Sequence, residues 1–184
     1  MMRLSKCFHL LFLLILSSFA FAGHYPAKVN KEINLYYDAP DFKKTVIVVK
    51  KGTWLNTKPM LFTTEIGYGL RSLHIAEQDL TALSDKKPLE LEQGIPFGEI
   101  KNTFPIKEVR ITKDTWLYNK SVLTQPNAEN LNSETPFLLK ATDVPCEVFQ
   151  EVSDKSGKTF YAIFFNDQIF YILKDDTSLI QNFR

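Results

Sequence analysis

The chain has 184 residues, of which 45% are hydrophobic and 23% are charged, a composition typical of a globular protein and not of a disordered one. Its formal net charge is +1, whereas binding to nucleic acid or to an anionic membrane surface would call for a strong basic excess. Composition and charge therefore argue against nucleic-acid partners, and the length allows one domain or two small ones.

The first 22 residues have the pattern of a secretory signal peptide. Arg3 and Lys6 give a basic start, an apolar run follows, and the segment ends in Ala20-Phe21-Ala22. The alternative is an uncleaved membrane anchor, although the apolar run is shorter than the roughly 20 residues of a spanning helix. We therefore expect an exported protein, periplasmic or secreted, without a stable membrane anchor.

The first half of the remaining chain begins with short strands. In the strand expected at 33–37, Leu35 and Tyr37 share one face, so Tyr36 on the other face is the aromatic residue most expected to meet solvent. A proline turn is expected at 38–41. Further strands are expected at 45–49, 53–55 and 60–64.

A helix is predicted over 67–87, because apolar residues recur at steps of three and four from Leu73 to Leu83. Short strands at 89–92 and 97–100 follow it. The segment 102–105 is the expected boundary between the two halves.

The second half predicts strands almost throughout. They are expected at 106–112, 115–118, 137–141 and 146–152, with an exposed polar loop at 125–135. Cys146 lies in one of these runs and is the one cysteine left after removal of the leader. A single thiol cannot form an intramolecular disulfide, so Cys146 is expected to be buried and inert. An intermolecular disulfide is the open alternative.

The closing segment 159–174 carries the clearest pattern in the chain. Two runs of aromatic and β-branched residues flank Asn166-Asp167, which predicts a hairpin with a two-residue turn. Both faces of this hairpin are apolar, with Tyr161, Ile163 and Phe165 on one and Phe160, Ala162 and Phe164 on the other. Because both faces must be covered, we expect the hairpin at the centre of a small barrel with another element packed outside it.

Two segments also resemble each other. Residues 47–61 align without gaps on 109–123, with identical residues at six of fifteen positions, and each segment contains one of the two tryptophans, Trp54 and Trp116. Chance similarity is the alternative, since strand–turn–strand segments draw on few residue types.

The second half resembles the bacterial SH3-like domain, a small barrel of exported proteins that often occurs in tandem. The matching stretches are 117–118 with the polar loop after them, 137–140, 147–161 and 169–172, and a comparable stretch in the first half is 33–52. Phe170 departs from the pattern, because the family usually has a glycine there. The resemblance implies a mostly β fold of two SH3-like barrels packed together, one unit at 23–104 with the inserted helix and one at 105–184.

The sequence contains no catalytic motif. It has neither a Gly-x-Ser-x-Gly elbow nor a phosphate-binding loop, and His24 and His74 have no second ligand at metal spacing. We therefore expect no enzymatic activity, no cofactor and no metal. The alternatives are an exported enzyme whose site assembles from distant residues such as His74, Cys146 and Glu147, and a structural subunit that dimerises through the aromatic hairpin.

The resemblance implies a binding function with cell-wall peptidoglycan or a protein or peptide segment as ligand. SH3-like barrels bind extended ligands between loops, where aromatic planes provide contact area at low entropic cost. The residues expected to bind the ligand are Tyr36, Tyr37, Trp116 and Tyr118. The oligomeric state is left open.

Overall fold

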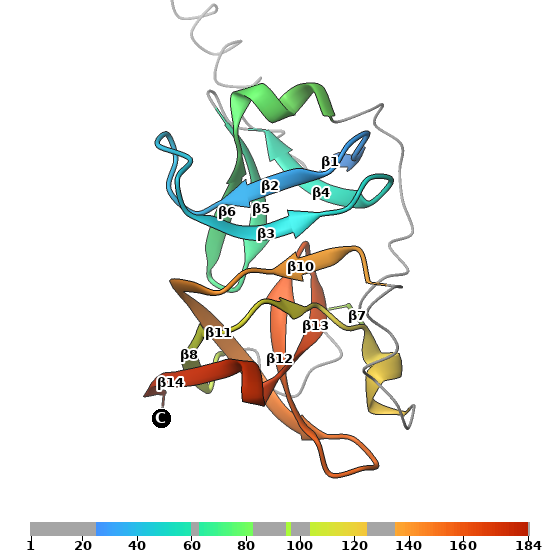
Figure 1. The fold of residues 1–184 in the computed structure, drawn as a ribbon, viewed down its shortest axis with the longest axis vertical. Helices are drawn as coiled ribbons and strands as arrows, with labels where there is room; N and C mark the ends of the chain where they lie inside the picture. The colour runs from blue at the N-terminus through green and yellow to red at the C-terminus, as the bar shows by residue number, and fades with distance from the viewer. Residues whose placement is uncertain (1–24, 60–62, 83–94, 97–103, 125–134, 184) are drawn as a thin grey trace, which may run out of the picture.

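The computed structural model describes residues 25–59, 63–82, 95–96, 104–124 and 135–183. Over these residues the protein is mostly β, and its antiparallel strands form a curled, half-barrel sheet (Figure 1). The expected signal peptide at 1–22 and the expected strands 89–92 and 97–100 lie outside the described residues. No helix in the described part has the length and apolar character needed to cross a membrane.

In the described part of the first half, six strands and one 3-10 helix form the upper part of Figure 1. They are β1 (Tyr25–Lys28), β2 (Ile33–Tyr36), β3 (Thr45–Val49), β4 (Trp54–Pro59), β5 (Thr64–Tyr68), β6 (Arg71–Ile75) and the 3-10 helix η1 (Glu77–Ala82). The strands expected at 33–37 and 45–49 are thereby confirmed. Alternating apolar residues such as Ile33 and Leu35 are buried, as the two-residue period of a strand requires.

The helix predicted over 67–87 is wrong for the residues that the structure describes. Strands β5 and β6 form a hairpin around Gly69-Leu70, and the 3-10 helix η1 follows them. Gly69 has a φ of +58°, a left-handed conformation that suits a tight turn. The pairs Ile66/Tyr68 and Leu73/Ile75 are buried with a period of two, so strand alternation outweighs the wider leucine spacing that favoured a helix.

The remaining described elements lie in the lower part of Figure 1. They are the strands β7 (Ile95–Pro96), β8 (Lys107–Ile111), β9 (Thr115–Trp116), β10 (Phe137–Leu139), β11 (Thr142–Ser153), β12 (Thr159–Phe165), β13 (Gln168–Leu173) and β14 (Thr177–Asn182), with the 3-10 helices η3 (Lys120–Leu123) and η5 (Lys174–Asp176), and all but β7 belong to the second half. The strands expected from the sequence are found in this part, whereas β14 was not expected.

The closing hairpin is confirmed, and so is its two-sided burial. Strands β12 and β13 join through Asn166-Asp167, whose φ values of 53° and 63° fit a two-residue turn. One face of the hairpin packs into the main core cluster and the other into a second cluster with Tyr118, Val122 and Phe149. Both apolar faces of the β12–β13 hairpin are therefore covered within one chain.

Strand pairing joins the two halves. Strand β10 pairs with β3, and Phe165 of β12 is the backbone partner of Tyr68 in β5. The Asn166 side chain accepts a hydrogen bond from the Asn56 amide and donates one to the Trp54 carbonyl at 3.3 Å. The main core cluster draws residues from both halves, so the two halves share it.

The order of pairing is the same in each half. In the first, β1 pairs with β4, β4 with β5 and β5 with β6, and the 3-10 helix η1 follows. In the second, β8 pairs with β11, β11 with β12 and β12 with β13, and the 3-10 helix η5 follows. This correspondence between the strands of the two halves differs from the sequence alignment of 47–61 on 109–123. That alignment superposes β4 on β9, yet β4 pairs with β1 and β5, whereas β9 pairs with β10.

Candidate functional site

The four aromatic residues expected to bind a ligand lie in two separate places. Tyr36 pairs with Thr45 at the start of β3, and Tyr37 follows it directly. Trp116 pairs with Leu138, which lies opposite Val48 near the other end of β3. The structure therefore places Tyr36 and Tyr37 at one end of this strand and Trp116 and Tyr118 toward the other, so the four do not form one surface.

Trp116 and Tyr118 have packing roles. Tyr118 is buried in the second core cluster, with its ring edge-on to Phe160 at a centroid distance of 6.2 Å. Trp116 is half-buried, and the Lys50 ammonium lies 4.2 Å from the centre of its ring. Because a cation already occupies this ring face, the pair offers little aromatic surface to a ligand.

The expectation that Tyr36 meets solvent is wrong. The pairing of β2 with β3 is irregular between Leu35 and Tyr36, but Tyr36 stays in register with His74, on the face opposite Leu35. Tyr36 is 8% exposed and buried beside the core, whereas Tyr37 is 37% exposed. The Phe42 ring packs edge-on against Tyr36, so contacts from the turn that follows β2 bury this side chain.

The turn after β2 forms one wall of a surface hollow. The hollow has a volume of about 600 Å³ and is lined by Asp41, Phe42, Ala76 and Gln78. Since Ala76 and Gln78 come from the end of β6 and from η1, the hollow lies between the β2–β3 turn and the 3-10 helix. Its lining residues were not predicted as site residues, although an aromatic residue directly after the Pro40-Asp41 turn was a signal that could have been used.

The local backbone holds Phe42 in an unusual conformation. Its φ is 49°, in the left-handed region that a bulky residue rarely adopts. The Phe42 amide donates to the Asp38 carbonyl at 2.6 Å, and the Tyr36 ring packs edge-on against the Phe42 ring at 5.7 Å. Strain of this kind costs on the order of 1–3 kcal/mol and persists only where surrounding contacts enforce it, often at binding sites.

The Asp38 carboxylate stabilises the same turn. Its Oδ1 accepts hydrogen bonds from the amides of Lys43 at 3.0 Å and Lys44 at 2.7 Å. Partial desolvation raises the pKa of Asp38, but the backbone hydrogen bonds, that from Lys44 foremost, outweigh it and hold the pKa below its usual value. The carboxylate is therefore charged at neutral pH and keeps the turn closed.

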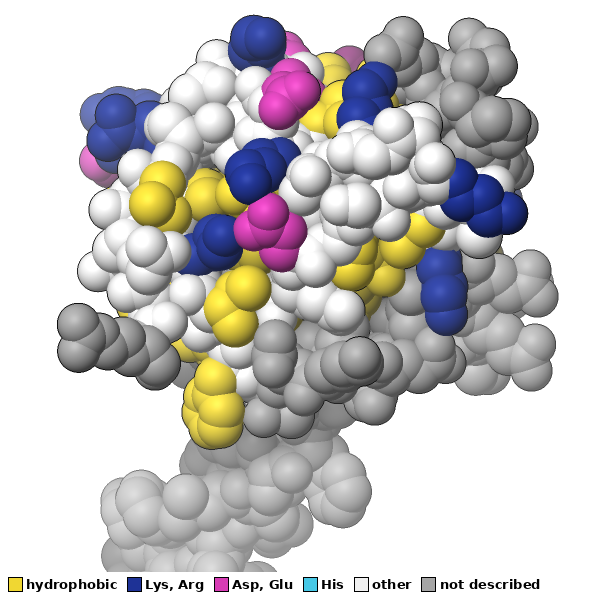
Figure 2. All heavy atoms as spheres, turned by 90° about the horizontal axis from the view of Figure 1, so that it is seen from below, with side chains coloured by type: hydrophobic (Ala, Val, Ile, Leu, Met, Phe, Trp, Pro, Cys, Tyr) yellow, Lys and Arg dark blue, Asp and Glu magenta, His cyan; other side chains and the backbone are white. Residues whose placement is uncertain are grey.

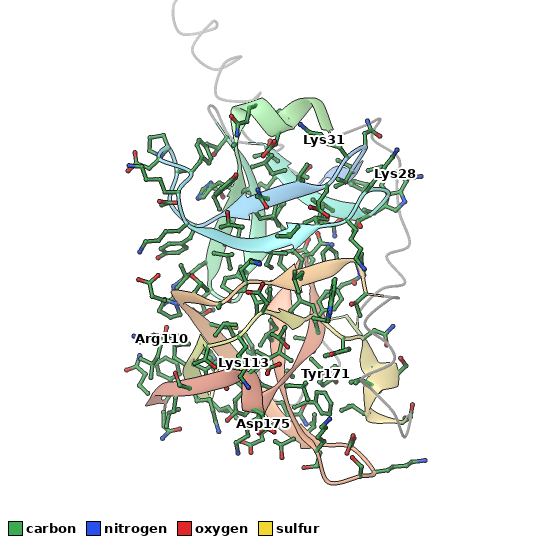
Figure 3. All side chains as sticks on the ribbon, viewed as in Figure 1. Lys28, Lys31, Arg110, Lys113, Tyr171 and Asp175 are labelled. Carbon is green, nitrogen blue, oxygen red and sulfur yellow. The ribbon has the colours of Figure 1, made fainter. Side chains whose placement is uncertain are left out.

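Charges of both signs surround the hollow. Lys43 lies 3.8 Å from Asp41 on the turn, and Lys31 lies 3.6 Å from Asp79 of η1. Figure 3 shows Lys31 beside the 3-10 helix at the upper end of the molecule. The hollow therefore combines an aromatic wall, an amide group and a mixed-charge rim, which suits an extended polar chain with apolar side groups.

A row of polar side chains crosses the adjoining strands. Tyr36 lies opposite His74, His74 opposite Glu65, and Glu65 opposite Lys58. Directly opposite residues of antiparallel strands share a face, so these four side chains form one line across β2, β6, β5 and β4. His74 is half-buried on β6, not on a helix, and within the described residues its buried Nδ1 has no hydrogen-bond partner.

The residues of the alternative catalytic site have other roles. Burial raises the pKa of the Cys146 thiol to about 12, against which the Tyr68 hydroxyl and Arg71 act in the opposite direction. Glu147 pairs with Arg71, and His74 belongs to the polar row. The described residues contain no group of three or more side chains able to hold a metal ion.

We expect Cys146 to resist alkylation in the folded protein, because the thiolate is the reactive form. Its raised pKa stabilises the folded state fully below about pH 9, and this contribution is lost as pH rises toward about 12. Iodoacetamide labelling, read by mass spectrometry of the peptide containing Cys146, measures the rate at which the thiol is alkylated. Unfolded protein in denaturant is the control and should react readily. Equally fast labelling of the native protein near neutral pH would contradict the buried thiol.

Comparison with models of protein families, with curated proteins and with solved structures finds no match for this chain. The hollow beside Phe42 and its surroundings are therefore the features from which a function can be inferred.

Proposed function

We propose that this chain is an exported, non-catalytic binding protein built of two SH3-like units. In this proposal the hollow beside Phe42 holds an extended segment of the ligand, either a peptide of the cell wall or a protein segment. The observation that best supports this proposal is the position of Phe42. Its aromatic side chain lies at the edge of a hollow, on a turn with a strained backbone that hydrogen bonds hold in place.

The repeated order of strand pairing supports the division into two units. In each half, four strands pair one after another in chain order and a 3-10 helix comes after the last of them, and the connection between the first two strands is long in both cases. In the first half that connection contains β2, β3 and the turn that carries Phe42. The position of the hollow between this turn and η1 agrees with ligand binding between loops of a small barrel.

Two observations favour a binding protein over the alternatives. A thiol with a pKa near 12 is a poor nucleophile at physiological pH, which weakens an enzyme built on Cys146. The aromatic hairpin is covered on both faces within one chain, so it does not provide an exposed interface for a structural subunit.

The proposal predicts that Phe42→Ala weakens retention on purified peptidoglycan by about tenfold, because an aromatic anchor in a binding site is worth roughly 1.4 kcal/mol or more. Co-sedimentation at increasing peptidoglycan concentration gives the affinity. Phe42→Tyr keeps the ring and should bind like the wild type. Phe104→Ala, an exposed phenylalanine away from the hollow, is the matched control.

Equal retention of wild type and Phe42→Ala would exclude the hollow as the binding site. A wild-type protein that is not retained at all would exclude peptidoglycan and leave a protein segment as the ligand. Screening of wild type, His74→Ala and Cys146→Ala for hydrolytic activity tests the enzyme alternative, and activity lost in either variant would overturn the non-catalytic assignment.

A further inference from the structure

The lining of the hollow beside Phe42 carries charge of one sign. Among the described residues, it consists of the Phe42 ring, the buried Ala76, the exposed side-chain amide of Gln78 and the carboxylate of Asp41. Neither a lysine nor an arginine belongs to this lining. The hollow therefore combines apolar surface with carboxylate and amide oxygens, which accept hydrogen bonds.

Further carboxylates lie on the two segments that form the hollow. Asp38 begins the turn that carries Asp41, and Asp79 belongs to η1. Asp79 is paired with Lys31 at 3.6 Å. Asp38 has no ion-pair partner among the described residues, and its Oδ1 accepts backbone amides instead. Negative charge is therefore in excess around the hollow.

The lysines of the turn do not occupy the hollow. The Lys43 ammonium lies 3.8 Å from Asp41, but the two side chains are 77% and 67% exposed, and such solvated pairs contribute little to stability. Lys44 extends to the second half, where its ammonium lies 3.4 Å from Asp143. A cationic group of a ligand could thus replace Lys43 beside Asp41 at little cost.

Aromatic rings elsewhere in this protein are in contact with cations. Lysine ammonium groups lie 5.8, 4.2 and 5.0 Å from the ring centres of Trp54, Trp116 and Tyr161. Within the described part of the chain, the half-buried Phe42 ring has no such contact, although it lines the hollow together with Asp41. A ring beside a carboxylate attracts a cation twice over. An anion would be repelled by Asp41, and a neutral apolar group would desolvate this carboxylate without compensation.

On the basis of the binding function proposed above, we propose that the hollow receives the side chain of a lysine in an extended peptide ligand. The ligand's ammonium group lies between the Asp41 carboxylate and the Phe42 ring, and the Gln78 amide oxygen accepts a further hydrogen bond. The methylene stem of the lysine packs on the apolar surface of Phe42 and Ala76. Charge complementarity, in addition to aromatic contact area, thereby selects the ligand.

NMR titration with short peptides of alanine and serine, blocked at both ends, tests this proposal. A peptide with a central lysine should bind about tenfold more tightly than the same peptide with norleucine, which has the same stem without the charge. Asp41→Asn should weaken binding of the lysine peptide by about tenfold and leave the norleucine peptide unchanged, so that the preference for lysine disappears. The amide signals of Phe42 and Gln78 should shift on binding.

Asp175→Asn is the matched control. It removes an exposed carboxylate from η5 at the opposite end of the molecule (Figure 3), where Figure 2 shows basic side chains beside acidic ones. The net charge changes as much as in Asp41→Asn, but both peptides should bind as they do to the wild type.

Equal affinity of the wild type for the lysine and norleucine peptides would overturn the cation site. So would an equal loss of lysine binding in Asp41→Asn and Asp175→Asn, since net charge alone would then be responsible. A wild type that binds neither peptide would also overturn it. Retention of Phe42→Ala on peptidoglycan decides separately whether the hollow binds a ligand, so the proposed function and the lysine preference can fail independently.

Discussion

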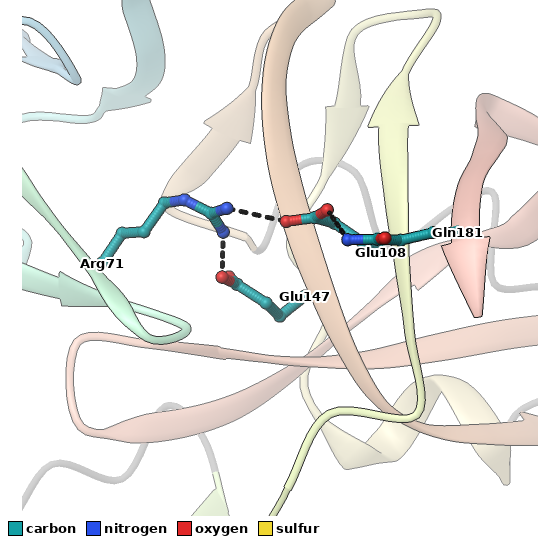
Figure 4. Close-up of polar contacts among 4 residues, drawn as sticks. All are labelled: Arg71, Glu108, Glu147 and Gln181. Carbon is teal, nitrogen blue, oxygen red and sulfur yellow. Dashed lines mark hydrogen bonds and ion pairs between the residues drawn. The ribbon is translucent and has the colours of Figure 1, made fainter. Parts of the chain in front are cut away.

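Replacing Arg71 by methionine is expected to lower the free energy of unfolding by about 3 kcal/mol, the lower end of the range for breaking a buried ion pair. Arg71 opens β6 and reaches into the second half, where one of its N–H groups pairs with Glu147 and another with Glu108 at 2.7 Å (Figure 4). Only 8% of the Glu108 side chain and 4% of the Glu147 side chain are exposed. Without the guanidinium, two buried carboxylates would face each other with no cation between them.

The surroundings make this loss hard to compensate. Gln181 of β14 donates to Glu108 at 2.8 Å, but within the described residues Glu147 Oε2 is buried with no hydrogen-bond partner. Gly69 closes the other side, because a Cβ at this position would overlap the Glu147 carboxylate. A substitution at Gly69 would therefore displace the Glu147 carboxylate, so the hairpin turn and the ion pair depend on each other.

Urea denaturation of wild type and Arg71→Met measures the effect. Arg110→Met removes an exposed arginine on β8 and should change stability by less than about 0.5 kcal/mol. Adding Glu147→Gln to Arg71→Met should recover part of the loss, because one uncompensated charge is removed with its partner. A loss below about 1 kcal/mol for Arg71→Met, or no recovery in the double variant, would show that the cluster does not join the two halves as described.

Phe165→Ala is expected to cost about 3–5 kcal/mol, the usual range for removing a large side chain from a tightly packed core. Phe165 is fully buried, with its ring 5.0 Å from that of Phe137 and 6.1 Å from that of Phe170. It also lies where the hairpin pairs with Tyr68 of the first half. The cavity would therefore open in the core that both halves share.

The same denaturation experiment applies, with Phe104→Ala as the control. Phe104 is 77% exposed, so its removal should be close to neutral. If the two halves unfold together, Phe165→Ala should shift one transition without splitting it. Similar small effects for both substitutions would contradict the central place of the hairpin in the core.

The helix predicted over 67–87 and the exposure predicted for Tyr36 were wrong for related reasons. Both expectations used the spacing of apolar residues in one segment, and in both cases contacts from outside the segment changed the outcome. Pairing of β5 with β6 satisfies the backbone of 64–75 as a hairpin. The Phe42 ring packs against Tyr36 and helps to bury it on the face opposite Leu35.

The sequence by itself determined the features that depend on neighbours in the chain. Asn166-Asp167 between two aromatic runs specified the closing hairpin, its two apolar faces required cover on both sides, and Cys146 in an apolar run implied a buried thiol. Turn chemistry and the two-residue period of a strand act over a few residues, so they can be read directly. Only the tertiary structure decided which strands pair, and with that the Arg71 cluster and the hollow beside Phe42. Each of these joins residues far apart in the chain, and their association depends on competition among many possible strand pairings, which no local pattern records.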